Sequence, residues 1–600
     1  MPDQRNLIMA VVFSVAIIFA FQFLFPSSKP VPKAPEQQTA TSQTTPAQEA
    51  AGGKAGGEKA VGANVPTGAN VPTVGAAGGK AVPTQSGAAT PSAESRAQVL
   101  AQSPRVQIRS PRLNGSIALT GARLDDLTLS DYRVSLKKDS PPITLLSPSG
   151  TSHGYYTQFG WTGLEKGLRL PNEKTVWRAD KNVLTAGGKV RLTWDNGKGL
   201  RFVRTIALDA NYLFTITQRV DNYGDRKVTL FPYGLISRAG TPKTLNFYIL
   251  HEGPLGVFDG TLKELKYKTL REDGNVTVKA ASGWIGITDK YWLVSLLPDA
   301  KKPITSRFIW DAKRKGYQVD FVWRRGVAVP ASGSAEISNH LFTGAKEVKL
   351  LDKYQENLGI ANLDKSIDFG WFYFLTKPLF LVLLLFHEYL GNMGVAILLL
   401  TVLVKLAFFP LANKSYRAMS KMKVLQPEMR KLRERNKDDK QRLNQEMMQL
   451  YKRHKVNPAS GCLPMVIQIP VFFALYKVLF VTIEMRQAPF FGWIQDLSVP
   501  DPTTVFNLFG LIPWHPPAML AIGIWPLIMG VSMFLQQKLN PTPPDPMQAK
   551  LFMFLPIIFT FMLARFPAGL VIYWTWNNTL SIAQQWVIMK RAGVAHPAAT

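Results

Sequence analysis

A single lysine interrupts one of the most apolar stretches of the chain. Lys405 lies within residues 392–411 (NMGVAILLLTVLVKLAFFPL), which are otherwise long and apolar enough to cross a bilayer. A cation at membrane depth costs about 2.5–3.5 kcal/mol on insertion scales, so such residues face a bundle interior or a hydrated cavity. Thr401 is four residues earlier and therefore shares a helical face with Lys405. This pair is the first candidate for a functional site.

Polar side chains also recur at helical spacing in other apolar segments. Gln468 lies in the middle of one segment, and Ser532 and Gln536 are four residues apart in another. The last segment carries a polar stripe with polar neighbours: Trp574, Asn578, Ser581 and Gln585, then Tyr573, Asn577 and Gln584. Amides in hydrocarbon must either bond between helices or line a hydrated groove. Because a cation accompanies them, we expect a shared hydrated groove.

Lys405 has no obvious acidic partner in the apolar segments, and Glu484 lies at the far end of its own helix. A buried ion pair would leave nothing for a ligand. An unpaired cation instead invites an acidic client, an anion or water. The charge is therefore a candidate contact for something that enters from outside the bundle.

Five apolar segments of the C-terminal part position these residues, and we expect each to be a transmembrane helix: 392–411, 463–483, 518–537, 551–566 and 569–589. A further stretch, 371–390, contains Lys377-Pro378 and His387-Glu388. A true span would avoid both features, so we expect this stretch to be a helix lying in the membrane interface.

The charge distribution gives the orientation. Residues 412–460, between the first two spans, hold 14 Lys/Arg and 5 Asp/Glu, whereas 485–517 has Arg486 as its basic residue. By the positive-inside rule, 412–460, 538–550 and the C-terminus are cytoplasmic. The region before the first core span is then outside, and the N-terminus is cytoplasmic.

Residues 412–460 also carry apolar positions with heptad-like spacing. Two short seams flank a polar connection at 436–441: Met422, Leu425, Met429 and Leu432, then Leu443, Met447 and Leu450. We expect a short antiparallel helical hairpin with basic outer faces, mobile because each arm has few heptads. The basic residues either follow from topology alone or dock the ribosome or lipid headgroups, and the sequence favours neither interpretation.

The N-terminal half contains three segments of different composition. Residues 7–25 form an apolar run whose length, without a small-residue cleavage site, favours an uncleaved anchor over a signal peptide. Residues 26–99 are rich in Pro, Ala, Gly and Thr, repeat GANVPT at 62–73, and are expected to be a disordered tether. From 105 to 352, short alternating runs separated by turn formers predict an antiparallel β-sandwich.

The expected β domain carries no metal cluster, nucleophile elbow or phosphate loop. Trp161, Trp177 and Trp284 could bind sugar or peptide, but packing in the core or at an edge is the simpler expectation. Cys462 is the only cysteine, so no disulfide framework can form within one chain. The net charge of +29 suits an anionic membrane surface or a ribosome. We expect no cofactor, no metal and no catalysis, and the lack of a Walker motif predicts ATP independence.

Several stretches closely resemble the YidC-type membrane protein insertases: QEMMQLYKRHKVNPASGCLPMVIQIPVFFALY at 445–476, RQAPFFGWIQDLS at 486–498, DPMQAKLFMFLPIIFTFM at 545–562 and FPAGLVIYW at 566–574. The resemblance covers 352–592, and one anchor followed by a large β domain is similar to the Gram-negative members. It implies an inner-membrane insertase and chaperone that works alone or with the Sec translocon. The implied partners are nascent integral membrane proteins, the ribosome and lipids.

The resemblance also implies a positive residue in a hydrophilic groove that is open to cytoplasm and lipid. Lys405 matches that position, where Arg is usual, so the charge is kept but the bidentate fork is lost. The family's groove contacts carry over to Thr401, Gln536 and Trp574, with Tyr573 nearby. The implied periplasmic domain is a β-supersandwich similar to sugar-mutarotase folds.

We therefore expect a monomeric, polytopic α-helical membrane protein, with a five-helix core plus an N-terminal anchor helix and a periplasmic all-β supersandwich. The expected client-contacting groove comprises Lys405, Thr401, Gln468, Ser532, Gln536, Tyr573, Trp574, Asn577 and Asn578. The expected boundaries are 1–25 for the anchor, 26–100 for the linker, 101–352 for the β domain, 353–390 for the interfacial region, 391–592 for the core and 593–600 for the tail.

Two other functions fit parts of the pattern. A secondary transporter of an anion would use Lys405 as its binding site, although the five core spans show no clear internal repeat. A membrane-tethered sugar-binding or envelope protein would place its activity in the β domain.

Overall fold

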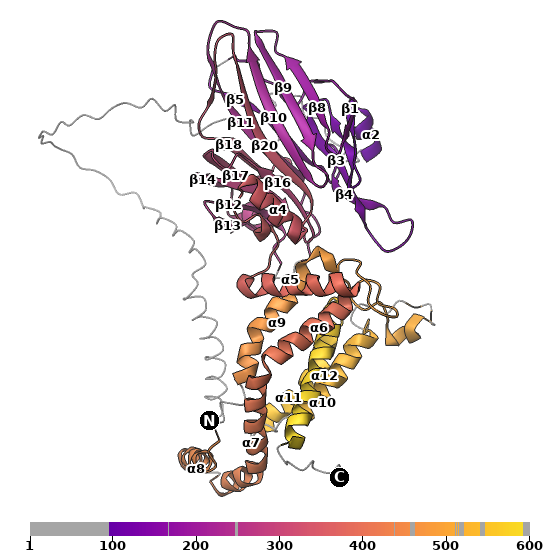
Figure 1. The fold of residues 1–600 in the computed structure, drawn as a ribbon, viewed down its shortest axis with the longest axis vertical. Helices are drawn as coiled ribbons and strands as arrows, with labels where there is room; N and C mark the ends of the chain where they lie inside the picture. Colours follow the sequence, from indigo (N-terminus) through magenta and orange to yellow (C-terminus); the bar gives the residue numbers. More distant parts are fainter. Residues whose placement is uncertain are drawn as a thin grey trace, which may run out of the picture. The chain divides into compact units, whose positions relative to one another are not determined.

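The structure is a computed structural model (Figure 1) that describes residues 95–591 except 166, 246–249, 437–438, 457–462, 511, 513, 515–520 and 540–545. The expected anchor at 1–25, nearly all of the expected linker and the tail at 593–600 lie outside the described residues. The described residues form a β-rich region and a helical core.

The β-rich region is a sandwich of two large sheets. The first sheet has 11 strands, in the order β14-β17-β18-β11-β5-β3-β2-β1-β7 with β19 on β11 and β4 on β3. Its strands are β1 (Arg105–Arg109), β2 (Leu113–Ala118), β3 (Arg123–Arg133), β4 (Pro142–Leu146), β5 (Tyr155–Gly163), β7 (Val183–Thr185), β11 (Val228–Ala239), β14 (Val276–Ala280), β17 (Ile304–Asp311), β18 (Gly316–Trp323) and β19 (Val327–Val329).

The second sheet has 9 strands, in the order β13-β12-β15-β16-β20-β10-β9-β8-β6. They are β6 (Arg178–Ala179), β8 (Lys189–Asp195), β9 (Leu200–Leu208), β10 (Leu213–Asn222), β12 (Gly253–Phe258), β13 (Thr261–Glu264), β15 (Gly283–Thr288), β16 (Trp292–Leu297) and β20 (Ser334–Ala345). Among the described residues, every strand pairing is antiparallel apart from β1 with β7. The predicted antiparallel β-supersandwich is thus confirmed.

Alternation of apolar and polar residues builds the core between the sheets. In β9, every second residue from Leu200 to Leu208 is buried, while the positions between them are partly or fully exposed. Period-two alternation places such residues on one face of the sheet. Trp161, Trp177 and Trp284 are 4%, 3% and 0% exposed, so all three are packed in the core rather than displayed to a ligand.

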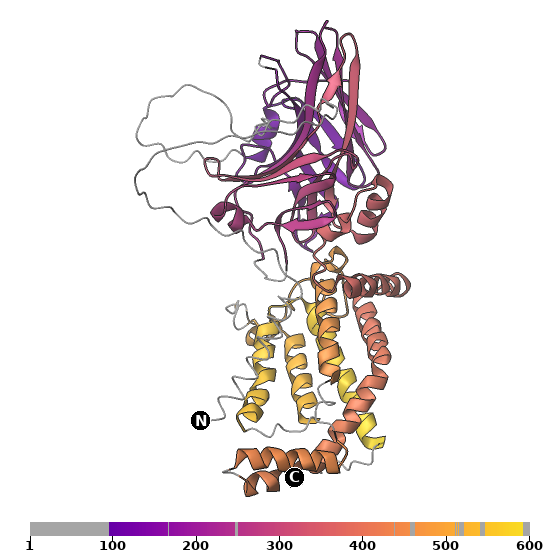
Figure 2. The same ribbon diagram turned by 90° about the vertical axis from the view of Figure 1, so that its left-hand side faces the viewer.

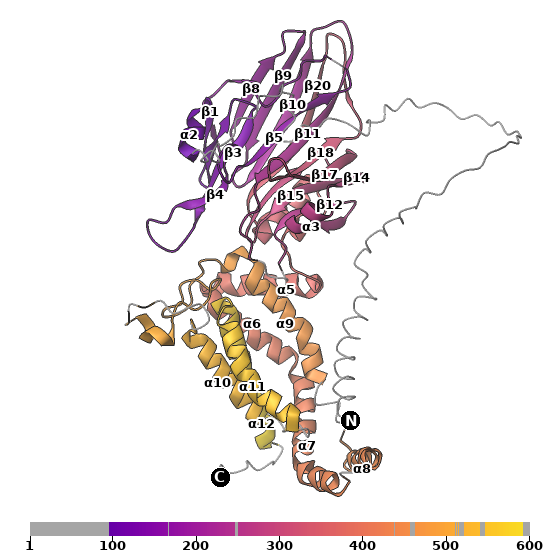
Figure 3. The same ribbon diagram turned by 180° about the vertical axis from the view of Figure 1, so that it is seen from behind.

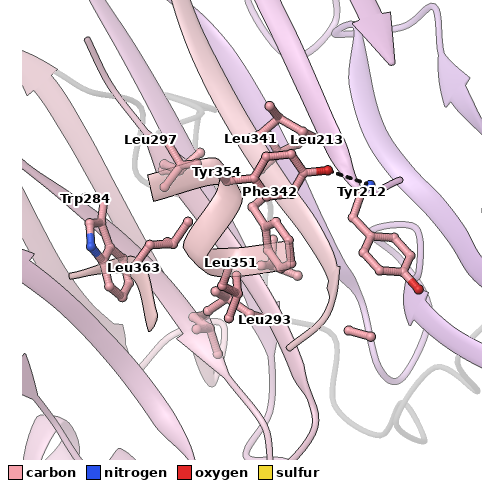
Figure 4. Close-up of a cluster of buried hydrophobic side chains, with 14 of the residues drawn as sticks. Tyr212, Leu213, Trp284, Leu293, Leu297, Leu341, Phe342, Leu351, Tyr354 and Leu363 are labelled. Carbon is pink, nitrogen blue, oxygen red and sulfur yellow. Dashed lines mark hydrogen bonds between the residues drawn. The ribbon is translucent and has the colours of Figure 1, made fainter. Parts of the chain in front are cut away.

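Three helices accompany the two sheets. Two short helices, α2 (Arg96–Ala101) and α3 (Tyr267–Glu272), accompany the strands, and α4 (Val348–Leu358) follows β20. Figure 4 shows Leu351 and Tyr354 of α4 among buried side chains of the sheet, including Phe342. The Tyr354 hydroxyl accepts a hydrogen bond of 3.4 Å from the Tyr212 backbone N–H. These contacts hold the chain firmly where it leaves the β domain.

Charged side chains fix the connection from the β domain to the helices. The buried Lys346 Nζ donates to Thr288 Oγ1 at 2.9 Å and to the Ser366 carbonyl at 3.2 Å. Burial lowers the pKa of Lys346 to about 8. Ser366 belongs to a short 3-10 helix, η1 (Leu363–Ser366), which lies between α4 and the first helix of the core.

That first helix, α5 (Tyr373–Leu390), contains the Lys-Pro pair that marked it as unusual. Lys377 Nζ forms ion pairs with Asp352 of α4 at 2.8 Å and with Asp364 of η1 at 2.7 Å, which explains a lysine in this apolar stretch. Phe374 and Tyr389 are 75% and 82% exposed, whereas Phe380 and Leu383 are buried. By length and composition α5 could also cross a membrane. Figure 1 shows it crosswise to α6 and α9, as an interfacial helix would be, and that assignment stays a prediction.

The expected spans correspond to five helices: α6 (Met393–Ala407), α9 (Leu463–Val481), α10 (Ile524–Leu539), α11 (Pro546–Leu563) and α12 (Ala568–Arg591). Figure 3 shows α10, α11 and α12 side by side. Two short 3-10 helices, η3 (Ile483–Met485) and η4 (Val505–Gly510), lie between α9 and α10.

The first span differs from the expected continuous helix over 392–411. The chain bends by 67° between α6 and the start of α7 (Phe409–Arg435). Pro410 lies in the first turn of α7, where its missing N–H is tolerated. Inside a continuous helix its ring would instead clash with the carbonyl four residues earlier. Lys405 therefore lies in the last turn of α6, just before the bend.

The predicted hairpin is formed by α7 and α8 (Lys440–Arg453), which Figure 2 shows packed side by side. One apolar cluster joins them: Leu425, Met429, Leu450 and Val456, with Met422, Leu432, Met447 and Tyr451 packed against it. Six of the seven predicted seam residues are in this cluster. Leu443 is half-buried and lies outside it, because it belongs to the first turn of α8, next to the connection.

Candidate functional site

A small polar cavity lies in the helical core, between α6, α7, α9 and α12. Its volume is about 50 Å³, and it is lined by Thr401, Val404, Lys405, Phe408, Leu411, Ala412, Tyr416, Gln468, Val471, Leu475, Tyr573, Asn577 and Gln584. About 10–15 Å³ of such free space holds one water molecule. The cavity therefore has room for a few waters, or for one small polar group.

Lys405 is held in this cavity by a neutral partner. Its Nζ donates a hydrogen bond of 2.7 Å to the Ser581 hydroxyl of α12. Ser581 in turn donates to the Asn577 carbonyl one turn earlier, at 2.7 Å. Tyr416, which follows the bend in α7, also hydrogen-bonds with Ser581. Side chains of α6, α7 and α12 thus meet at the Ser581 hydroxyl, and this contact holds the Lys405 ammonium in place.

No carboxylate neutralises Lys405 within the part of the chain that the structure describes. The sequences of α6, α9, α10, α11 and α12 contain no Asp or Glu at all. Coulomb attraction is strong in a medium of low dielectric constant, so a carboxylate in this bundle would pair with the ammonium. The arrangement leaves the positive charge available to an incoming group.

Other predicted residues form the cavity walls. Gln468 Nε2 donates to Asn577 Oδ1 at 3.2 Å, which joins α9 to α12 beside the lysine. Thr401 faces the cavity, but its hydroxyl donates to the Ile397 carbonyl of its own helix at 2.7 Å. Tyr573 lines the cavity and is 3% exposed. Five of the nine predicted groove residues therefore meet here: Lys405, Thr401, Gln468, Tyr573 and Asn577.

The other four, Ser532, Gln536, Trp574 and Asn578, do not line this cavity, and their contact with clients stays a prediction. Asn578 Nδ2 donates to Ser532 Oγ at 3.1 Å, a buried bond between α12 and α10. Trp574 packs against Phe472 and Phe559, and Gln536 is half-buried on α10. Successive helical residues point about 100° apart, so neighbours such as Asn577 and Asn578 serve different interfaces. The pair of Asn578 and Ser532 joins two helices instead of lining the cavity.

Three residues that take part in this site were not among the predicted groove residues. Ser581 and Gln584 follow Asn577 by four and seven positions, which places them on its helical face. That spacing could have selected them over Asn578 and Trp574. Tyr416 could not be selected in this way, because it reaches the cavity only through the bend at Pro410.

Comparisons with known proteins identify both regions of the chain. The family model described as "60Kd inner membrane protein" matches residues 385–594, and the model "YidC periplasmic domain" matches residues 105–382. A "Membrane protein insertase YidC" from Beijerinckia indica subsp. indica is 55% identical over 515 residues, covering 83% of this chain and 84% of the relative. Another from Bradyrhizobium diazoefficiens is 49% identical over 615 residues, covering 99% of this chain and 97% of the relative.

Among solved structures, "Active YidC insertase crystal structure with the first transmembrane domain resolved" is 17% identical and covers 80% of this chain and 92% of its own. Its TM-score of 0.35 is too low to support a shared fold by itself. The two family models and the sequence relatives carry the assignment. The chain belongs to the YidC family of membrane protein insertases, inner-membrane proteins with a periplasmic domain.

Proposed function

We propose that the cavity around Lys405 is where this insertase engages its clients. A polar or acidic extracytoplasmic tail of a nascent membrane protein enters between α6, α9 and α12 and is transiently attracted to the ammonium. The observation that carries this proposal is a lysine held by a neutral serine, in helices that contain no acid. An ion pair inside the bundle would have neutralised the charge of Lys405.

The free energy for insertion comes from the client and from the membrane field. The client's apolar helix gains about 0.3–0.6 kcal/mol per strongly apolar residue when it enters lipid. The membrane potential, positive outside, helps an acidic tail by about 2.3 kcal/mol per charge per 100 mV. The cavity satisfies polar groups that bare lipid would leave unpaired. A hydrated, single-point contact at Lys405 also allows release.

Photocrosslinking to a stalled nascent chain tests this proposal. A photoreactive residue at Val404, which lines the cavity, is expected to crosslink to the client's tail. The same residue at Leu399, which is 40% exposed on another face of α6, serves as the matched control. Equal crosslinking from both positions, or none from Val404, would contradict entry through the cavity.

We further propose that the β domain is periplasmic, with both chain ends and the α7–α8 hairpin in the cytoplasm. Cysteine labelling tests this in a Cys462→Ala background. An impermeant thiol reagent is expected to label Lys138→Cys, an exposed loop position, once the outer membrane is opened. Lys452→Cys, exposed on α8, is expected to react only after the inner membrane is opened. The reverse pattern would overturn the orientation.

The cytoplasmic face would bring clients to the cavity. The hairpin presents many basic side chains, including exposed Lys414 and Arg430, which suit ribosomal RNA or anionic lipid headgroups. The ribosome, the Sec translocon and membrane lipids are therefore the proposed partners, and the insertase works as a monomer, with or without Sec. This work needs no ATP.

A further inference from the structure

The loop between β3 and β4 displays apolar side chains to the outside of the β domain. Val134 and Leu136 are 58% and 54% exposed, whereas Leu127 and Leu129 of the adjoining strand are buried. Figures 1 and 3 show this loop projecting from the sheet beside β4. Apolar side chains exposed close together mark interaction surfaces more often than apolar residues scattered singly. We call residues 133–141 the β3–β4 tip.

Hydrogen bonds within the tip hold its shape. The Val134 N–H donates to the Pro141 carbonyl at 3.0 Å, and Arg133 Nη1 donates to the Ser140 carbonyl at 2.8 Å. The Ser135 N–H donates to the Ser140 hydroxyl oxygen at 2.7 Å. A loop that is already ordered loses little conformational entropy when it binds. The tip therefore presents its apolar side chains in a fixed arrangement.

The tip is bound to a segment of the helical core that is expected to lie at the membrane surface. The Arg133 carbonyl accepts hydrogen bonds from Arg486 Nη2 and from Gln487 Nε2, the latter at 3.1 Å. Both donors follow η3 directly, and η3 comes after the expected span α9. Phe491 and Trp493, a few residues further along, are 62% and 42% exposed. Exposed aromatic residues that adjoin a span, Trp above all, are typical of the membrane–water interface. The tip is thus anchored where the bilayer surface is expected.

Basic side chains accompany the apolar pair. Lys137 and Lys138 follow Leu136 and are exposed, as is Arg133 at the base of the tip. Asp139 is the one acidic residue in the sequence of the tip, so the tip carries a net positive charge. Each lysine close to an anionic membrane surface strengthens binding by about fivefold. The long stem of a lysine also lets its ammonium stay among the headgroups while apolar neighbours lie deeper.

An anionic bilayer surface is the partner that this combination fits. Binding to a bilayer strengthens with the apolar area that is buried and with attraction to anionic lipids, and the tip offers both. Lysine is depleted in the interfaces between proteins, so two lysines next to the apolar side chains fit headgroups better than a protein partner.

We propose that the β3–β4 tip binds the anionic phospholipid surface of the membrane. Val134 and Leu136 enter the headgroup region, and Lys137 and Lys138 pair with lipid phosphates. Under the proposed orientation of the chain, this surface is the periplasmic one. The contact holds the β domain to the bilayer at a point distant in sequence from α4 and η1, where the chain passes into the helical core.

Fluorescence quenching tests this proposal with the full-length protein in vesicles. An environment-sensitive fluorophore is attached to Leu136→Cys in a Cys462→Ala background, and the phospholipids carry a nitroxide quencher near the headgroup. The vesicles contain phosphatidylcholine and phosphatidylglycerol. The matched control is Tyr223→Cys, since Tyr223 is 60% exposed and follows β10 at the end of the second sheet opposite to α4. The probe at residue 136 is expected to be quenched, and the probe at residue 223 is expected to keep its fluorescence.

Removing the two lysines tests the role of charge. Lys137→Gln combined with Lys138→Gln is expected to lower the ratio of bound to free tip by about thirtyfold, because each lysine contributes about fivefold. Most of the quenching at residue 136 should then be lost, and vesicles of phosphatidylcholine alone should have the same effect on the unsubstituted tip. Lys198→Gln combined with Lys227→Gln, at exposed positions before β9 and β11, is the matched control and should leave the quenching unchanged.

Equal quenching of the probes at residues 136 and 223 would overturn the proposal. Quenching at residue 136 that persists without the lysines and without phosphatidylglycerol would overturn the recognition of anionic lipid. Both leaflets carry the quencher, so the result does not depend on the orientation of the chain or on client entry at Lys405. Cysteine labelling and crosslinking from Val404 test those two proposals separately.

Discussion

Lys405→Glu is expected to block the insertion of single-span clients with acidic tails, while Lys405→Arg retains it. The first substitution replaces attraction by repulsion at the point where the lysine gives the cavity its charge. Opposite and like charges 4 Å apart differ by about 8 kcal/mol at an effective dielectric constant of 20, an upper bound for a hydrated cavity. Even a quarter of this difference would slow insertion by more than about tenfold. Lys405→Arg keeps the positive charge and adds a planar fork that can bind a carboxylate through two parallel N–H groups.

Reconstituted vesicles with an imposed membrane potential provide the measurement for this prediction. Lys353→Glu, which reverses a charge at an exposed position of α4 outside the cavity and the hairpin, is the matched control and is expected to insert clients normally. Clients with neutral tails should tolerate Lys405→Ala better than clients with acidic tails. If Lys405→Ala inserts acidic tails at the normal rate, the charge is not needed and entry depends on polarity alone.

Ser581 is the contact that gives the lysine a defined position. Lysine has a flexible four-carbon stem and tends to extend towards a polar surface, the more so near a helix end. Lys405 lies in the last turn of α6, so its ammonium could reach past the bend. The 2.7 Å bond to Ser581 Oγ retains it over α12, where Gln584 also faces the cavity. The Lys405 ammonium is therefore held inside the cavity.

The sequence alone predicted the type and order of the elements well. Alternating strands such as β9 and the apolar seam of α7 and α8 depend on local periodicity, which is visible in the residues. The need for an intramembrane cation to have a polar setting also follows from its type. Lys405, Gln468 and Asn577 were therefore predicted to lie together, and the structure brings them together.

What could not be predicted depends on rotation and bending of helices. The polar stripe of α12 divides between two interfaces, so Asn578 bonds with Ser532 of α10 while Asn577 faces Gln468 of α9. The bend before α7 brings Tyr416 to Ser581 from a segment expected to lie beyond the span. Both effects arise from contacts between distant segments, and the hydropathy of a single segment does not predict such contacts.

The start of α10 provides a further case. The sequence predicted a span over 518–537, but α10 begins at Ile524. Asp501, from the preceding loop, accepts a hydrogen bond of 2.9 Å from the Trp525 backbone N–H. Thr503 Oγ1 similarly accepts from the Ile524 backbone N–H at 3.1 Å. The first N–H groups of a helix have no acceptor within the helix and need water or a capping side chain. In α10, side chains of the preceding loop supply these acceptors.

Asp501→Ala is accordingly expected to destabilise the helical core by about 3–5 kcal/mol. Besides the Trp525 N–H, Asp501 Oδ1 accepts from Trp493 Nε1 at 3.1 Å and from the N–H and hydroxyl of Thr503 at 3.0 and 2.7 Å. Asp501 is 9% exposed, so alanine would leave most of these donors in a place that water reaches poorly. Gly523 allows this approach, because a Cβ there would lie 2.5 Å from Asp501 Cγ.

Hydrogen exchange at the first turn of α10, together with the thermal midpoint in detergent micelles, would measure this loss. Asp496→Ala is the matched control, because Asp496 accepts only from the N–H and hydroxyl of Ser498 among the hydrogen bonds of the described residues. Asp501→Asn should fall between the two, since an amide keeps the shape but replaces one acceptor oxygen with a donor. If Asp501→Ala and Asp496→Ala had equal effects, Asp501 would not set the start of α10, and the helix would have to begin at Ile524 for reasons within its own sequence.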